Sequence, residues 1–290
     1  MSNTLTVHYL VFAGGSMKFA LTSFGTLLFL LSALTCGAQT YRSELLLGVD
    51  AYKNSRYEEA IQHFKKAIEL DSSQVNAHMY LATTYVSQFI PGVDTADNKA
   101  VAEGAIEEYR HLLDMDGSTE SKLNSSKGIA YVYLNMKQFP EAKQYYQKAS
   151  SLDPSDPEAY YSIGVIDWTQ SYQPRMEARA KLGMRPEENL NAKDPGQRQI
   201  CDELMAKNRA TVEDGIDNLN KAIQLRPDYD DAMAYLNLMY RERADLQCNN
   251  LVLRSEDLKT ADHWVDETLR VKKMKAEKEA GAAATAPSPQ

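Results

Sequence analysis

The chain has little of what nucleic-acid binding and common catalytic motifs require. Its 290 residues carry 32 lysines and arginines against 40 aspartates and glutamates, a formal net charge of −8. This balance argues against nucleic acid as a partner, because DNA and RNA are bound by a basic face. The sequence contains no glycine-rich phosphate loop outside its first residues and no Gly-x-Ser-x-Gly nucleophile elbow. We therefore predict no enzymatic activity and no cofactor.

Histidine and cysteine are too few and too scattered to predict a metal site. Four histidines lie beyond the N-terminal segment, and no two of them are four residues apart on one helix face. A structural zinc site needs about four convergent ligands. The sequence therefore predicts no metal. These histidines are His63, His78, His111 and His263.

Only one long apolar run is present, and it lies near the N-terminus. Lys18 precedes an uncharged stretch, residues 19–34, and Cys36-Gly37-Ala38 follows with small residues. The order positive, apolar, small is typical of a secretory signal, and the run is shorter than the roughly 20 residues of a membrane span. We expect residues 1–38 to be a leader that is removed on export, with Met17 as the true start. The mature chain would then be periplasmic or secreted, without a stable membrane span.

Two other interpretations of this leader stay open. The apolar run is either cleaved or retained as a membrane anchor. Acylation of Cys36 is a further alternative, although Ala33 stands where a lipobox normally has leucine.

The rest of the chain is organised around one stretch, residues 123–156. Its apolar positions recur at helical spacing in two successive segments. Pro140 occupies the first turn of the second segment, and Pro154 ends it. The stretch therefore predicts two amphipathic helices joined by a short turn. The positions that define the two faces are Ile129, Ala130, Tyr133, Ala142, Tyr146 and Ala149.

This pattern resembles the tetratricopeptide repeat, a helix–turn–helix unit of about 34 residues. Ser126 departs from the family's usual tryptophan. Four further copies align by the same anchors, at residues 41–74, 75–119, 157–229 and from 230 onward. The resemblance implies an all-α, right-handed α-solenoid of about five repeats over residues 39–275. Together with the leader, it indicates an exported bacterial protein.

Three insertions interrupt the repeats, near residues 87–99, 170–208 and 244–259. Each falls between the first and second helix of a repeat, so we expect them on one edge of the stack, as a wall or cap beside the groove. Within the second insertion we expect a short helix over Arg175–Leu182 and a long helix from Gln197. Residues 276–290 are low in apolar bulk and contain two prolines, which predicts a disordered tail.

Cys201 and Cys248 fall in the insertions of neighbouring repeats. An exported chain meets an oxidising compartment, so we expect a disulfide between them, with two free thiols as the alternative.

The resemblance also implies where a ligand would bind. In this family the first helices of the repeats line a concave groove that takes a protein or peptide, and we expect a non-catalytic scaffold or adaptor in the bacterial envelope. The alternative is a pocket for a small molecule, such as a glycan or lipid fragment, closed by the insertions. The groove positions are Tyr52, Lys53, Met79, Thr83, Asn124, Lys127, Tyr131, Asn135, Tyr161, Trp168 and Arg241.

Overall fold

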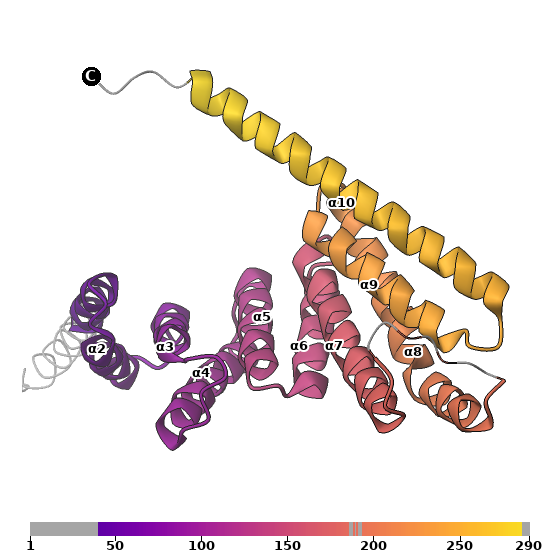
Figure 1. The fold of residues 1–290 in the computed structure, drawn as a ribbon. Coiled ribbons are helices and arrows are strands. Elements are labelled where there is room, and N and C mark those ends of the chain that lie inside the picture. Colours follow the sequence, from indigo (N-terminus) through magenta and orange to yellow (C-terminus); the bar gives the residue numbers. More distant parts are fainter. Residues whose placement is uncertain (1–39, 186–187, 189, 191–192, 286–290) are drawn as a thin grey trace, which may run out of the picture. The chain divides into compact units, whose positions relative to one another are not determined.

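The computed structural model describes residues 40–185, 188, 190 and 193–285, and the predicted leader, with Met17 and Cys36, lies outside them. Throughout the described ranges the regular structure is helical, without strands, and the helices follow one another in pairs (Figure 1). This confirms the predicted all-α solenoid. After a helix whose described part is residues 40–53, the elements are α2 (Tyr57–Leu70), α3 (Val75–Gln88), α4 (Ala96–Asp114), α5 (Thr119–Asn135), α6 (Phe139–Leu152), α7 (Pro157–Lys181), α8 (Pro195–Leu225), α9 (Asp230–Leu246) and α10 (Leu251–Thr285).

The described residues fall into two compact units, which divide between Ala77 and His78. Among the described helices, none is both long and apolar enough to cross a bilayer.

In the first unit, the helix at 40–53 packs against α2 through small residues and one ring. Phe64 is fully buried, and a Cβ atom on Gly48 would lie 2.5 Å from its Cε1 atom. Glycine therefore makes room for the ring. The turn between the helices is closed by Arg56, whose amide donates to the Ala51 carbonyl, with Ser55 at a positive φ of 57°.

In the second unit, α5 and α6 repeat this design. Ala142 and Ala149 are fully buried, as expected from the sequence, and the Gln138 amide donates to the Tyr133 carbonyl across the turn. Lys137 has a positive φ of 60° at the position that corresponds to Ser55. Two standard repeats thus share the same turn geometry.

The first insertion forms a loop, residues 89–95, between α3 and α4. Asn98 organises it: its side-chain oxygen accepts from the Ile90 amide, and its amide group donates to the carbonyls of Ile90 and Val93. These three bonds hold the loop to the first turn of α4.

The second insertion differs from the prediction. The expected short helix at Arg175–Leu182 does not exist as a separate element, because α7 continues without a break to Lys181 with Pro174 inside it. Proline removes one helical hydrogen bond, but contacts on both sides of it keep the helix in place: Ser171 and Arg179 are buried. The predicted long helix is present as α8.

The third insertion is also mostly helical, because it lengthens α9 to Leu246 and begins α10 at Leu251. The two helices lie side by side, and α10 extends past α9 (Figure 1).

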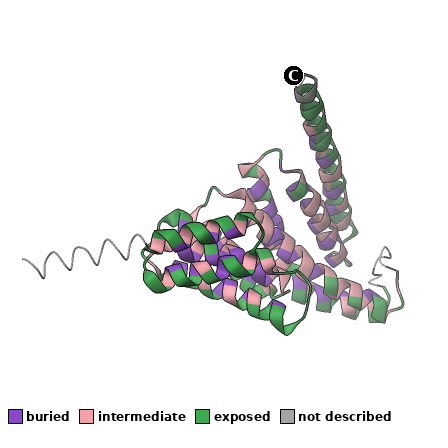
Figure 2. Ribbon diagram, turned by 90° about the vertical axis from the view of Figure 1, so that its left-hand side faces the viewer, coloured by how far each residue is buried: buried purple, intermediate pink, exposed green. Residues whose placement is uncertain are grey.

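The predicted disorder from residue 276 is wrong in its boundary, since α10 reaches Thr285. Val271 is buried, and Lys275 pairs with Asp230 at 2.5 Å, which anchors the helix immediately before its exposed end (Figure 2). Residues 286–290 lie outside the described part.

Candidate binding groove

The predicted groove positions of α5 form one stripe along that helix. Their spacing places them on one face. Asn124 and Tyr131 are exposed, Tyr131 by 42%. Lys127 is held by Asp156 at 2.8 Å, and the Asn135 side chain donates to the Tyr131 carbonyl. The stripe therefore offers one aromatic ring and one amide that a ligand can reach.

The remaining predicted positions of the first two repeats are less exposed or belong to the other unit. Met79 and Thr83 of α3 are half-buried, and the Thr83 hydroxyl donates to the Met79 carbonyl. In the first unit, Lys53 is exposed, and the ring of Tyr52 lies 5.8 Å from that of Tyr57.

On α7 and α9, the predicted aromatic positions belong to a continuous row of rings. Tyr161 lies 5.8 Å from Tyr235, Tyr235 lies 5.5 Å from Trp168, and Trp168 stacks on Tyr172 at 5.0 Å. Burial, together with the charges of neighbouring groups, raises the pKa of Tyr161 to about 12. The rings therefore contact one another, and the Tyr161 hydroxyl stays protonated at neutral pH.

A cavity of about 310 Å³ lies where α7, α9 and α10 meet. Trp168 and Arg241, two predicted groove residues, line it together with residues of the two C-terminal insertions. Residues of the second and third insertions therefore line this cavity, and they do so as parts of helices. The lining residues are Trp168, Tyr172, Arg175, Arg179, Leu238, Arg241, Glu242, Asp245, Arg254 and Leu258. We call this the arginine pocket.

Asp245 is the centre of the ion pairs in the arginine pocket. Its carboxylate lies 2.6 Å from Arg175 Nη1, 3.0 Å from Arg179 Nη2 and 3.7 Å from Arg254 Nη2. Arg175 also pairs with Glu242 at 2.9 Å. The carboxylate therefore holds guanidinium groups from α7 and α10 around one point on α9.

Burial shifts the pKa values of two groups in this network, Glu242 and Arg179. Glu242 is 3% exposed, and desolvation raises the pKa of its carboxyl to about 7, against the attraction of Arg175. Arg179 is 2% exposed, and desolvation lowers the pKa of its guanidinium.

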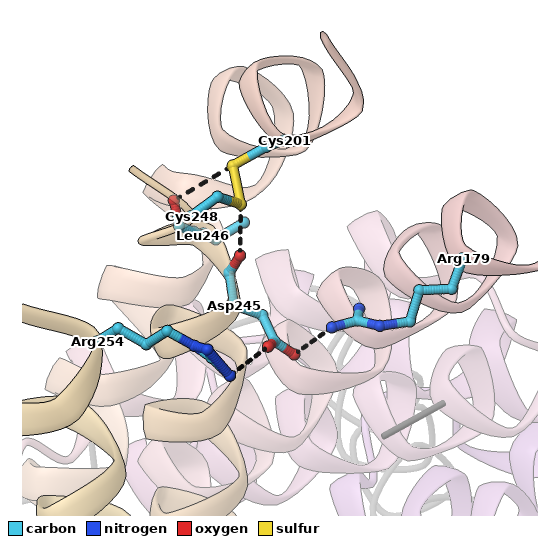
Figure 3. Close-up of a disulfide and its surroundings, with 6 residues drawn as sticks. All are labelled: Arg179, Cys201, Asp245, Leu246, Cys248 and Arg254. Atoms are coloured by element: carbon cyan, nitrogen blue, oxygen red, sulfur yellow. Dashed lines mark hydrogen bonds and ion pairs between the residues drawn. A yellow bond between two sulfur atoms is a disulfide. The ribbon is translucent and has the colours of Figure 1, made fainter. Parts of the chain in front are cut away.

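A disulfide joins Cys201 of α8 to Cys248 in the α9–α10 turn, as expected from the sequence (Figure 3). The Asp245 carbonyl lies 3.1 Å from Cys248 Sγ, and the side chain of the same residue points toward Arg179 and Arg254 (Figure 3). The bridge therefore fixes the turn that positions the central carboxylate of the arginine pocket.

A second buried ion pair connects α6, α7 and α8. Lys143 lies 2.5 Å from Asp167 and 2.6 Å from Asp214. Asp167 is fully buried, and desolvation raises the pKa of its carboxyl to about 7 although Lys143 opposes the shift. Lys143 of α6 thus links α7 and α8, at a site where Asp167 is buried and Asp214 is partly exposed.

Sequence reasoning missed the arginine pocket. Arg175 and Arg179 are four residues apart, which places them on one face of any helix that includes both. The spacing of the two arginines could have indicated the pocket. The predicted break in the helix near Pro174, however, placed them on a different helix from Trp168 and Tyr172.

Comparison with known proteins agrees with the helix-pair pattern. A family model described as the TPR repeat, the tetratricopeptide repeat, matches residues 50–88 and 130–171. The chain therefore contains tetratricopeptide repeats in these two segments. The matched segments include the two standard turns described above, at Ser55 and Lys137.

Solved structures of this type share the fold at low sequence identity. One crystal structure of MamA is 17% identical, with a TM-score of 0.53, covering 87% of this chain and all (100%) of that one. MamA of Desulfovibrio magneticus RS-1, from residue 41 to its end, is 16% identical with a TM-score of 0.50, covering 82% of this chain and 96% of that one.

Among curated proteins, the chain is similar to the type IV pilus assembly protein PilF of Pseudomonas aeruginosa. The two are 27% identical over 168 residues, which is 57% of this chain and 60% of that protein. The match thus spans less than two thirds of the relative. Tetratricopeptide repeats stack into extended surfaces that bind other proteins, so the general role indicated for this chain is an interaction scaffold.

Proposed function

We propose that this protein is a non-catalytic scaffold or adaptor of the bacterial envelope that holds a partner segment along the first helices of its repeats. The observation that carries the proposal is the exposed stripe of α5. Helix α5 packs against its neighbours through other residues, such as Ile129 and Val132, which are fully buried. Tyr131 and Asn124 are exposed and are therefore available to a partner.

The chemistry of the stripe and of the aromatic row suits a peptide. Aromatic rings supply contact area at low entropic cost, and amides hydrogen-bond an extended backbone. Tyr131 and Asn124 on α5, and Trp168 and Tyr235 on α7 and α9, provide both kinds of group.

The envelope part of the proposal is supported by two observations. The predicted leader, residues 1–38, is typical of an exported chain, and the curated relative is named for type IV pilus assembly. A test is to fractionate cells that express the full chain with a C-terminal tag. Recovery in the periplasm or medium as a shortened product supports export, whereas recovery of the uncleaved chain in the cytosol contradicts it.

Partner binding is tested by affinity capture from the same cells with two matched variants. The groove variant is Asn124→Ala/Tyr131→Ala on α5, and the control is Gln144→Ala/Lys148→Ala, two exposed positions on α6. We expect partners that the native chain and the control capture to be lost from the groove variant, with circular dichroism unchanged. Equal capture by all three proteins would contradict a ligand on α5.

A second candidate function is favoured by the arginine pocket. Its walls combine groove residues with residues of both C-terminal insertions, so it provides a partly enclosed space for a small ligand. In this case the scaffold would bind a small molecule rather than a protein segment, and equilibrium binding of pure ligands, instead of partner capture, is the measurement that decides.

A further inference from the structure

The arginine pocket concentrates positive charge in an acidic protein. Arg175, Arg179 and Arg254 surround Asp245, and Glu242 is the only other carboxylate among the described lining residues. Three guanidinium groups therefore face two carboxylates, before the fourth lining arginine is counted. The chain as a whole has a formal net charge of −8. The pocket, in contrast, has more arginines than carboxylates among its lining residues.

The fourth arginine is Arg241, at the mouth of the pocket. Its guanidinium donates hydrogen bonds to the Asn237 side chain at 2.9 Å and to Asp262 at 2.8 Å. The side chain of Asp262 is 70% exposed, so water screens this pair and it contributes little to the neutralisation of the pocket.

One donor in the wall of the pocket is unused. Arg179 Nη1 is buried without a hydrogen-bond partner among the residues that the structure describes, although Nε and Nη2 of the same group have partners at 3.0 Å each, the Glu188 carbonyl and Asp245. Leaving a buried charged donor unpaired costs free energy. Because Nη1 is enclosed by protein, it adds positive charge to the wall of the pocket and does not itself reach a ligand.

The rest of the lining is aromatic and aliphatic. Trp168 stacks on Tyr172, and the Arg175 guanidinium carbon lies 5.2 Å from the centre of the Tyr172 ring. Leu238 and Leu258 complete the lining. A volume of about 310 Å³ is at the lower end of the range of small-molecule pockets, roughly 300–1,000 Å³.

We propose that the arginine pocket binds an oxyanion group, a carboxylate or a phosphate, that is carried next to a planar apolar group. Guanidinium groups recognise both oxyanions through paired hydrogen bonds, and Trp168, Leu238 and Leu258 supply apolar contact for the planar part. The inference deepens the proposed function, since it names the chemistry that the α7–α9 end of the groove takes. The oxyanion then belongs either to an acidic residue of a bound segment or to a free small molecule.

The two tryptophans make this testable by fluorescence. Trp168 lines the pocket and Trp264 does not, and the sequence contains no other tryptophan. In a Trp264→Phe protein, Trp168 is the only reporter. The probes are phenyl phosphate, benzoate and a blocked Phe-Glu dipeptide, with uncharged benzamide and sodium chloride as controls. We expect a saturable change in Trp168 emission with the oxyanion probes and none with the controls.

Variants of arginine identify the site. Arg241→Gln removes a guanidinium from the pocket, and Arg270→Gln removes an exposed one elsewhere on α10. We expect Arg241→Gln to weaken probe binding about tenfold, the value of one charge-assisted hydrogen bond, and Arg270→Gln to leave it unchanged. Arg254→Gln gives a second measurement if the first variant does not fold.

Absence of saturation with all oxyanion probes, equal binding of benzamide, or equal loss in Arg270→Gln would each overturn the inference. Preference for the dipeptide supports an acidic residue of a bound segment, and preference for the other two probes supports a free ligand. Because pure probes are used, failure here is distinct from failure of partner capture at α5.

Discussion

Helices α5 and α6 are 17 and 14 residues long, whereas α8 and α10 are 31 and 35. The short pair is held by small apolar residues, such as Ala130 and Ala142, which are fully buried. The extended pairs, α7 with α8 and α9 with α10, also bury charged groups. Examples are Arg179 of α7 and Glu242 of α9. A repeat that keeps its standard length can therefore rely on close helix packing, while residues added beyond that length need other contacts.

The added residues are held by a disulfide and by ion pairs between helices. Arg243 of α9 is one example: it lies 2.6 Å from Asp257 of α10 and 3.1 Å from Glu213 of α8. A buried pair of this kind adds less stability than its distance suggests, because both charges lose their hydration. The pair does determine which faces of the helices pack together. The extended helices need such contacts because they lack the repeat's pattern of small packing residues.

Removing the disulfide should have the largest effect on this difference. We expect Cys201→Ala/Cys248→Ala to lower the free energy of unfolding by up to about 4 kcal/mol, since the bridge closes a long loop in the unfolded chain. Hydrogen exchange should accelerate in residues 195–208 and in the α9–α10 turn, but not in α5 and α6. Dithiothreitol should reproduce the change in the native protein and do nothing to the variant. Uniform acceleration throughout would contradict a local role.

A methyl group at Gly128 should instead disturb the packing of α5 against α4. A Cβ atom there would lie 2.4 Å from Cε2 of Tyr109, so the ring or the helix must shift. We expect Gly128→Ala to cost roughly 1–3 kcal/mol, as overpacked cores do, measured by urea unfolding. Gly281→Ala, where no atom lies within 4 Å, is the control and should not destabilise. Equal stability of both variants would show that helix packing tolerates the methyl group.

The Asp167 carboxyl should make stability depend on pH. Burial raises its pKa from 3.8 to about 7, so between these values the folded state binds a proton that the unfolded state has lost. This contribution to stability is complete below about pH 4 and falls as pH rises through 7. Asp167→Asn cannot ionise, so we expect the variant to gain stability relative to the native protein from pH 5 to 8. A constant difference across that range would contradict the raised pKa.

The smallest expected change in stability comes from Tyr131→Ala. An exposed side chain away from caps and charge networks usually contributes within about 0.5 kcal/mol, and Tyr131 is 42% exposed. Thermal unfolding should therefore be almost unchanged. A loss comparable to that in Gly128→Ala would mean that the ring supports the fold, and the argument for a ligand there would fail.

The standard repeats could be predicted well from the sequence. Ala142, Tyr146 and Ala149 occupy one face at helical spacing, and all three are buried. The pattern is readable because each repeat uses the same small residues at the same positions. The Cys201–Cys248 pair could also be expected, since both residues fall in neighbouring insertions.

The extended pairs could not be predicted as well, because tertiary contacts there outweigh local signals. Pro174 normally indicates a helix end, yet α7 continues through it, since Arg179 has buried contacts one turn later. In the same way, alanine- and lysine-rich sequence after Lys275 indicates disorder by composition, yet helix propensity favours continuation once the preceding turn is anchored. The arginine pocket forms only because α7 continues through Pro174. A prediction that ends the helix there therefore misses the pocket as well.

The central claim is that a partner lies along the first helices of the repeats. The most direct test places a photo-crosslinking amino acid at Tyr131 of α5 or at Lys148 of α6, both of which are exposed, in the full chain expressed in cells. We predict a discrete crosslinked partner from position 131 and none from position 148. Crosslinks of equal yield from both positions, or a partner found only from position 148, would contradict the account.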